Sequence, residues 1–185
     1  MSDAGAPGFR VVAERAKDRV WITTWTELDC VGPGGERFSR TVVRHPGAAC
    51  VVPVDDRGQV VLVRQWRASL GREELELPAG VLDNDGEPPE AAARRELKEE
   101  VALRAGRIEH LLSYDSSPGM TDERVHLYLA TDLEPVAPVT GTHEEAAMTI
   151  VRLPLAQAVA MAARGEIANA AAVIGLLLAG RRLLP

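Results

Sequence analysis

The chain has 185 residues, of which 46% are hydrophobic and 26% charged, a composition typical of one globular domain that excludes a disordered protein. Its formal net charge of -6 at pH 7 argues against a basic surface for nucleic acid, so we expect no nucleic-acid partner. Its two cysteines, Cys30 and Cys50, lack metal-type or redox-type spacing, which predicts ordinary thiols and a cytoplasmic protein.

The sequence predicts neither a signal peptide nor a membrane span. Its first nine residues lack the basic start and the apolar stretch of a signal peptide. The most apolar run, residues 170–180, is much shorter than the roughly 20 residues that a spanning helix needs. We therefore expect no membrane partner and interpret this run as a buried or interface helix.

The first 44 residues consist of strand-like pieces and turns. Residues 9–13 and 20–28 favour strands because they are rich in β-branched and aromatic side chains. A turn at residues 32–35 then leads to a hairpin partner at residues 38–44. We expect this N-terminal β region, residues 1–44, to precede a main domain of residues 45–185.

The main domain should combine a central sheet with flanking helices, which makes its fold class α+β. Residues 49–54 and 59–66 form apolar strands around the turn signal at 55–58. The remaining predicted elements are strands at 108–114, 124–130 and 149–153, and helices that start near 87 and cover 154–164 and 169–180.

The segment from Gly80 to Leu103 concentrates acidic residues in an otherwise helical pattern. Residues four apart share a helix face, so Glu96 and Glu100 stack, with Glu99 beside them. Carboxylates this close repel one another unless a cation offsets them, and oxygen ligands suit Mg2+ or Mn2+ better than Zn2+. The alternative for such a charge run is a solvated helix face.

The segment resembles the signature of the Nudix hydrolase superfamily: Gly, five residues, Glu, seven residues, Arg-Glu-apolar-any-Glu-Glu-any-Gly-apolar. Two positions depart from it, because six residues separate Gly80 from Glu87 and Ala102 replaces the second Gly. We expect the extra residue in the loop before the helix, a shifted helix end at Ala102, and no lost ligand. The matching residues are Gly80, Glu87, Arg95, Glu96, Leu97, Glu99, Glu100 and Leu103.

The resemblance implies an α/β/α sandwich with a mixed sheet and a metal site that holds Mg2+, or Mn2+. It assigns the metal to the backbone carbonyl of Ala79 and to Glu96, Glu99 and Glu100, with Glu99 acting directly or through a water. Arg95 would pair with Glu99 and fix its rotamer, whereas Glu87 would close the loop onto the helix.

The segment SPGMTDE, residues 117–123, indicates a subgroup. Pro118 lies fifteen residues after Leu103, as in Nudix enzymes that hydrolyse ADP-ribose, and ELPAG and HEEAAM also resemble bacterial, actinobacterial-type ADP-ribose pyrophosphatases. The likeness runs from about Thr41 to Gly180. It implies metal-dependent hydrolysis of ADP-ribose to AMP and ribose 5-phosphate.

The water-activating base in this subgroup lies on a later loop. Glu145 matches best and Glu144 second, although an acidic pair alone would favour a plain surface. Arg67 would bind the pyrophosphate or a ribose, or else form a surface salt bridge. The other substrate candidates are Glu76, Trp66, Trp25, Pro118, Gly119 and Glu123, the two tryptophans being equally consistent with core positions.

The resemblance also implies a homodimer in which N-terminal strands cross to the partner. Two alternatives to ADP-ribose hydrolysis stay open from the sequence. One is the same chemistry on another nucleoside diphosphate sugar, such as GDP-mannose, or on an oxidised nucleotide. The other is a non-catalytic Nudix module that binds a ligand and regulates a partner, which the intact Glu96, Glu99 and Glu100 pattern disfavours.

Overall fold

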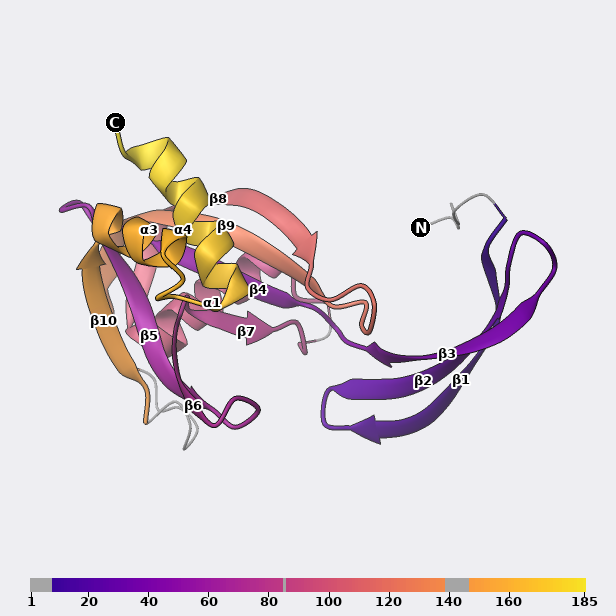
Figure 1. Cartoon of the computed structure of the whole chain (residues 1–185). Coiled ribbons are helices and arrows are strands. Elements are labelled where there is room, and N and C mark those ends of the chain that lie inside the picture. Colours follow the sequence, from indigo (N-terminus) through magenta and orange to yellow (C-terminus); the bar gives the residue numbers. More distant parts are fainter. Residues whose placement is uncertain (1–7, 85, 139–146) are drawn as a thin grey trace. The chain divides into compact units, whose positions relative to one another are not determined.

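The computed structural model describes residues 8–84, 86–138 and 147–185, which form two compact units (Figure 1). The N-terminal unit comprises Met1–Gly47 together with Asp115–Arg124. The layered unit comprises Ala48–Tyr114 and Val125–Pro185. The boundary expected between residues 44 and 45 stays a prediction.

A three-stranded antiparallel sheet makes up most of the N-terminal unit. Its strands are β1 (Arg10–Val20), β2 (Thr23–Val31) and β3 (Arg37–Arg44), in the order β1-β2-β3. The predicted strand bounds of 9–13 and 20–28 differ from those of β1 and β2. The first strand continues to Val20, and the turn before β2 lies at Trp21 and Ile22. Every residue of β1 is exposed, so this strand carries no apolar alternation by which its length could be recognised.

The loop of residues 115–124 also belongs to the N-terminal unit. Val43 of β3 forms a bridge with Thr121, and its amide donates to the Met120 carbonyl at 2.9 Å. Asp122 accepts from the Arg44 guanidinium at 3.0 Å and from the His45 amide at 2.9 Å. These contacts join residues 115–124 to the end of β3.

The layered unit contains two sheets, ordered β10-β5-β6 and β7-β4-β9-β8. β4 runs parallel to β9 and antiparallel to β7, so the second sheet is mixed, as predicted. The apolar strands predicted from residue 49 onward are confirmed, with ends that differ by a few residues. The strands are β4 (Ala48–Pro53), β5 (Gln59–Arg67), β6 (Arg72–Glu76), β7 (Ala79–Val81), β8 (Leu103–Asp115), β9 (Arg124–Pro135) and β10 (Thr149–Pro154).

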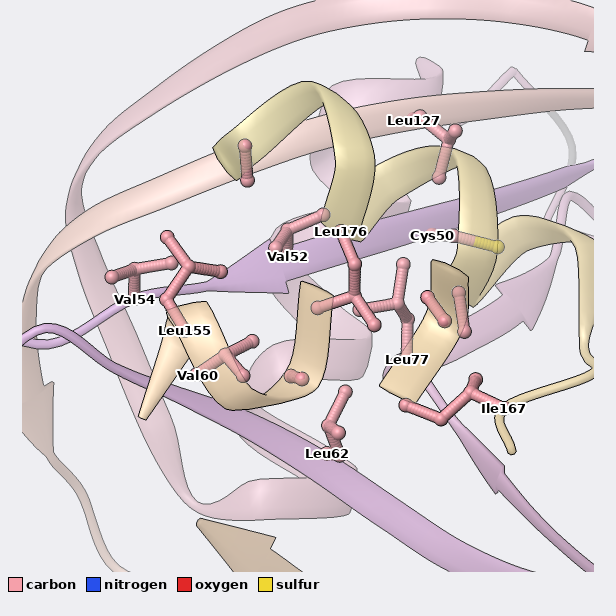
Figure 2. Close-up of a cluster of buried hydrophobic side chains, with 14 of the residues drawn as sticks. Cys50, Val52, Val54, Val60, Leu62, Leu77, Leu127, Leu155, Ile167 and Leu176 are labelled. Carbon is pink, nitrogen blue, oxygen red and sulfur yellow. The ribbon is translucent and has the colours of Figure 1, made fainter. Parts of the chain in front are cut away.

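Two hydrophobic cores lie on the two faces of the strands, because neighbouring strand residues point to opposite sides. Along β4, Cys50 and Val52 pack with α3 (Leu155–Ala163) and α4 (Ala170–Leu183) (Figure 2). Ala49 and Val51 pack instead with α1 (Pro89–Val101). The predicted α/β/α sandwich is therefore confirmed.

Helix α1 begins after Pro88 and ends at Val101. Its predicted buried stripe of Ala93, Leu97 and Val101 is confirmed. Ala102 takes the left-handed conformation, with φ 54° and ψ 42°, and its amide donates to the carbonyls of the last turn. The expected shift of the helix end is therefore not observed, because alanine adopts the strained geometry that glycine would favour.

Helix α4 has the buried face expected of residues 170–180, formed by Ala172, Leu176 and Ala179 among others. Among the helices that the structure describes, none is both long and apolar enough to cross a membrane. Cys30 is half-buried and Cys50 buried, and the two cysteines form no disulfide.

Candidate active site

The acidic residues of α1 occupy the helix face beside its buried stripe. Glu96 is buried at 7% exposure, whereas Glu99 and Glu100 are half-buried. Glu96 is one of four buried polar or charged residues in the described ranges, the others being Thr26, Glu74 and Glu76. A buried carboxylate requires partners, because removing its charge from water is costly.

Arg95 pairs with three carboxylates, two on α1 and one in the loop before it. Its guanidinium donates to Glu96, to Glu99 at 3.0 Å, and to Glu87 at 3.1 Å. The Asn84 side-chain amide donates to the same Glu87 oxygen at 3.1 Å. The expected Arg95–Glu99 pair is thus present, and Glu87 joins the loop before α1 to the helix.

Hydrogen bonds and charge pairs within this cluster favour the ionised forms of Glu87 and Arg95. The hydrogen bond from Arg95 lowers the pKa of Glu87 against the opposing effect of burial, and the Asn84 hydrogen bond lowers it further. Burial acts against the charge on Arg95, but Glu87, Glu96 and Glu99 together raise its pKa above the ordinary value. Both groups therefore stay ionised at neutral pH.

Strand β7 receives two carboxylates from α1. The Ala79 amide donates to Glu100 at 3.0 Å, although the two residues are 21 positions apart. Gly80 lies against Glu96 so closely that a Cβ at this position would fall 1.8 Å from Oε1 and 2.1 Å from the carboxyl carbon. The absent side chain of Gly80 therefore makes the space that the Glu96 carboxylate fills.

The donor chemistry of this segment suits a hard cation, since it offers carboxylates and backbone oxygens. Within the residues that the structure describes, however, no group of three or more His, Cys, Asp or Glu side chains is arranged to hold a metal ion. In the described structure Arg95 pairs with Glu96 and Glu99, and the Ala79 amide donates to Glu100.

The β5–β6 hairpin places Arg67 beside Glu76. Arg67 donates to both oxygens of Glu76, at 2.8 and 2.7 Å, in a bidentate pair. Glu76 is buried, whereas 44% of the Arg67 side chain is exposed. Trp66 and Trp25 are 62% and 46% exposed, so their alternative interpretation as core residues is wrong.

The loop of residues 115–124 carries three predicted substrate residues and lies in the N-terminal unit. Pro118 and Gly119 occupy an exposed turn that is closed by the Met120 amide donating to the Ser117 carbonyl at 2.9 Å. Glu123 accepts from the Ser116 hydroxyl at 2.5 Å. The predicted bases Glu145 and Glu144 lie outside the described residues.

Sequence reasoning missed two features of this region. Asn84 was not singled out, although an Asn in a short loop just before a helix is a common source of side-chain hydrogen bonds. Glu74, buried and paired with Arg72 at 2.7 Å, was also missed, because its burial depends on how β6 pairs with β5 and packs in the fold.

Comparison with known proteins identifies a family match. The NUDIX domain family matches residues 43–173. The ADP-ribose pyrophosphatase of Mycobacterium tuberculosis strain H37Rv is 47% identical over 145 residues, which cover 78% of this chain and 70% of the relative. The ADP-ribose pyrophosphatase of Bacillus subtilis strain 168 is 35% identical over 138 residues, 75% of this chain and 74% of the relative.

The fold also matches a solved structure, a crystal structure of an ADP compounds hydrolase. The TM-score is 0.84 with 24% sequence identity, and the match covers 98% of this chain and 97% of the other. At this identity the likeness concerns the fold.

Proposed function

This chain belongs to the Nudix hydrolase family, and we propose that it hydrolyses the pyrophosphate bond of ADP-ribose to release AMP and ribose 5-phosphate. The observation that supports this most strongly is the set of α1 carboxylates beside β7. Glu96 fills the space beside Gly80, and Glu100 binds the Ala79 amide, so two acidic groups are held at one backbone segment. The shared sequence with two ADP-ribose pyrophosphatases supports the choice of substrate.

Nudix hydrolases generally use a divalent metal, and we propose Mg2+, with Mn2+ as its substitute. The Ala79 carbonyl, Glu96, Glu99 and Glu100 would hold it. A bound divalent cation neutralises phosphate oxygens and lowers the pKa of a bound water. Arg95 would position the ligands, because its contacts with Glu96 and Glu99 offset the repulsion among the carboxylates and fix their rotamers.

The remaining roles follow the residues singled out in the sequence. We propose Glu145 as the base that takes a proton from the attacking water, with Glu144 as the alternative. Arg67 would bind the diphosphate, because a guanidinium held by a buried carboxylate is pre-oriented for bidentate contact with phosphate oxygens. Glu76 orients Arg67, while Trp66, Pro118, Gly119 and Glu123 would contact the nucleoside and the ribose.

We also propose that the enzyme is a cytoplasmic homodimer joined through the N-terminal unit. The sheet of this unit exposes large apolar side chains that water disfavours, namely Val11, Val12, Val20, Trp21 and Trp25. The two cysteines form no disulfide, which is compatible with a reducing compartment. The net charge of -6 gives no support for a nucleic-acid partner.

Product analysis tests the proposed reaction. Purified protein is incubated with ADP-ribose and, separately, with GDP-mannose and other nucleoside diphosphate sugars, in Mg2+, Mn2+ or EDTA. We expect AMP and ribose 5-phosphate from ADP-ribose, only with metal. Preferential cleavage of another substrate would contradict the specificity, and binding without turnover would contradict catalysis.

The same assay separates the two candidate bases. Glu145→Gln should lower kcat by roughly 100-fold or more, with little change in the affinity for substrate, because general-base catalysis typically contributes that much. Glu144→Gln is the matched control and should retain most of its turnover. The reverse result would assign the base to Glu144.

A further inference from the structure

A cavity of about 430 Å3 is lined by residues of α1, by the first residues of β8 and by Val136. Four cationic residues line it, Arg94, Arg95, Lys98 and Arg104. Lys98 is two positions from both Glu96 and Glu100, which places it about 200° around the helix from each of them. The cavity therefore adjoins the carboxylate cluster at Arg95, whereas Lys98 lies on a different part of the helix surface from Glu96 and Glu100. In a chain of net charge -6 this cationic lining stands out.

The four cationic residues that line the cavity differ in how many acidic side chains pair with them. Arg95 is held by Glu87, Glu96 and Glu99, whereas Arg94 pairs with Glu90 and Arg104 with Glu134. Glu90 and Glu134 are 54% and 62% exposed, so water competes for these two pairs. Within the described part of the chain, Lys98 forms no ion pair. An anion in the cavity would therefore meet Lys98 and Arg104 without breaking a buried contact.

The rest of the cavity wall is apolar. Leu103 and Ala105 are buried residues of β8, and Val136 is half-buried beyond the end of β9. The Arg94 guanidinium is fixed at this wall by its donation to the Ala105 carbonyl at 2.9 Å. A cavity of several hundred Å3 with apolar walls and a few cations is typical of sites for small organic anions.

We propose that this cavity binds a small phosphate monoester that carries a ring or another compact apolar body. A dianionic head group satisfies more than one cation, and guanidinium forks match phosphate oxygens. The apolar body would displace water from Leu103, Ala105 and Val136. This site does not depend on the proposed substrate, because the residues assigned to its head group lie outside the predicted catalytic set.

Calorimetric titration of the full chain with phenyl phosphate, in EDTA, tests the proposal. We expect one saturable site in the wild type and at least roughly tenfold weaker binding in the double variant Lys98→Gln, Arg104→Gln, because it loses two charged contacts. Arg107→Gln is the matched control. It matches the Arg104 substitution of the double variant, because it removes one charge from an equally exposed arginine of β8, 72% against 70% for Arg104, that does not line this cavity.

The remaining outcomes are equally informative. Inorganic phosphate should bind more weakly than phenyl phosphate to the wild type, and Val136→Trp, which fills the cavity, should abolish phenyl phosphate binding. Undiminished binding in the double variant, or an equal loss in Arg107→Gln, would overturn the site. Binding of inorganic phosphate as tight as that of phenyl phosphate would overturn the apolar contact.

Cleavage of ADP-ribose by the same proteins keeps the two proposals distinct. The double variant should turn over as the wild type does, which also shows that it is folded. A wild type that binds phenyl phosphate in the cavity but cleaves no ADP-ribose would refute the proposed reaction and leave the cavity site intact.

Discussion

The N-terminal unit and the layered unit hold their carboxylates in opposite ways. In the N-terminal unit, Asp29 and Glu27 pair with Arg15 and Lys17 on an exposed sheet. In the layered unit, Glu76 and Glu96 are buried and held by Arg67 and Arg95. Exposed ion pairs contribute little because water and salt screen them, whereas a buried carboxylate keeps one fixed geometry. Fixed geometry is what a catalytic site requires.

The largest effect on turnover is expected for a substitution of Glu100, a carboxylate that the layered unit holds in place. Glu100→Gln should reduce turnover by roughly 100-fold or more, since the amide cannot replace a negatively charged metal ligand. The glutamine oxygen can still accept from the Ala79 amide, so the fold should be retained. Steady-state kinetics with Mg2+ and thermal unfolding measure the two effects.

Glu90→Gln is the matched control for this change, because Glu90 lies on the same helix but is exposed and paired with Arg94. Its turnover should be close to that of the wild type. Normal turnover in Glu100→Gln would exclude Glu100 as a ligand.

Removing most of the N-terminal unit also tests the comparison. A chain that lacks residues 1–40 should become monomeric and lose most of its activity, because the proposed dimer forms through the apolar side chains of this sheet. Size-exclusion chromatography with light scattering gives the mass, and the ADP-ribose assay gives the activity. An active monomer would exclude a catalytic role for the dimer.

Two glycines provide a matched pair, one from each unit. A Cβ on Gly80 would lie 1.8 Å from Glu96 Oε1, and a Cβ on Gly32 would lie 1.9 Å from Glu36 Oε1. Glu36 is exposed and can rotate away, whereas Glu96 is buried and held by Arg95. Displacing Glu96 moves a predicted metal ligand, so the same substitution should have different consequences.

We expect Gly80→Ala to lower kcat by about 10- to 100-fold, because small misplacements of catalytic groups have effects of this size. Gly32→Ala should leave kcat nearly unchanged. The two variants are compared by steady-state kinetics at saturating metal. Equal effects of both substitutions would contradict a positional role for Gly80.

Acid titration compares the ion pairs of the two units. In the folded protein Arg95 lowers the pKa of Glu87 below its ordinary value of 4.5. The resulting stabilisation is fully present above pH 4.5 and is lost as the pH falls through the lowered folded pKa. Arg95→Gln should therefore reduce the free energy of unfolding at pH 7 by about 1–3 kcal/mol and flatten its decrease in acid.

The control for this prediction is Arg15→Gln. Arg15 lowers the pKa of Asp29 by an exposed hydrogen bond, so the direction is the same and the change should be smaller. Urea unfolding at several pH values between 3 and 7 measures both. A larger loss in Arg15→Gln would reverse the ranking of the two units.

The smallest expected effect concerns Ala102. Ala102→Gly should stabilise the protein by up to about 1 kcal/mol, because relief of the left-handed strain exceeds the added entropy of the unfolded chain. Ala102→Val should destabilise it, since a β-branched residue fits this conformation worse. Thermal unfolding distinguishes the two. A destabilised glycine variant would show that Ala102 carries no strain.

Local patterns were sufficient for the elements of the layered unit. The apolar runs of β4 and β5 and the buried stripe of α1 could be read from the sequence, because burial imposes a period on neighbouring residues. The length of β1 could not be read, since all of its residues are exposed. The helix end at Ala102 also differs from the prediction, because alanine takes the left-handed conformation there although intrinsic preference disfavours it.

The sequence by itself determined which side chains of α1 share a face, because helical spacing is a property of the backbone. It therefore identified the carboxylates and the Arg95–Glu99 pair, whereas the family was indicated by the resemblance of the whole motif to a known signature. Only the tertiary structure decided that Glu100 binds the Ala79 amide, that Glu96 fills the space beside Gly80, and that cationic residues of α1 and β8 line one cavity. These contacts join residues from different layers, and their distances depend on how the layers pack rather than on any local period.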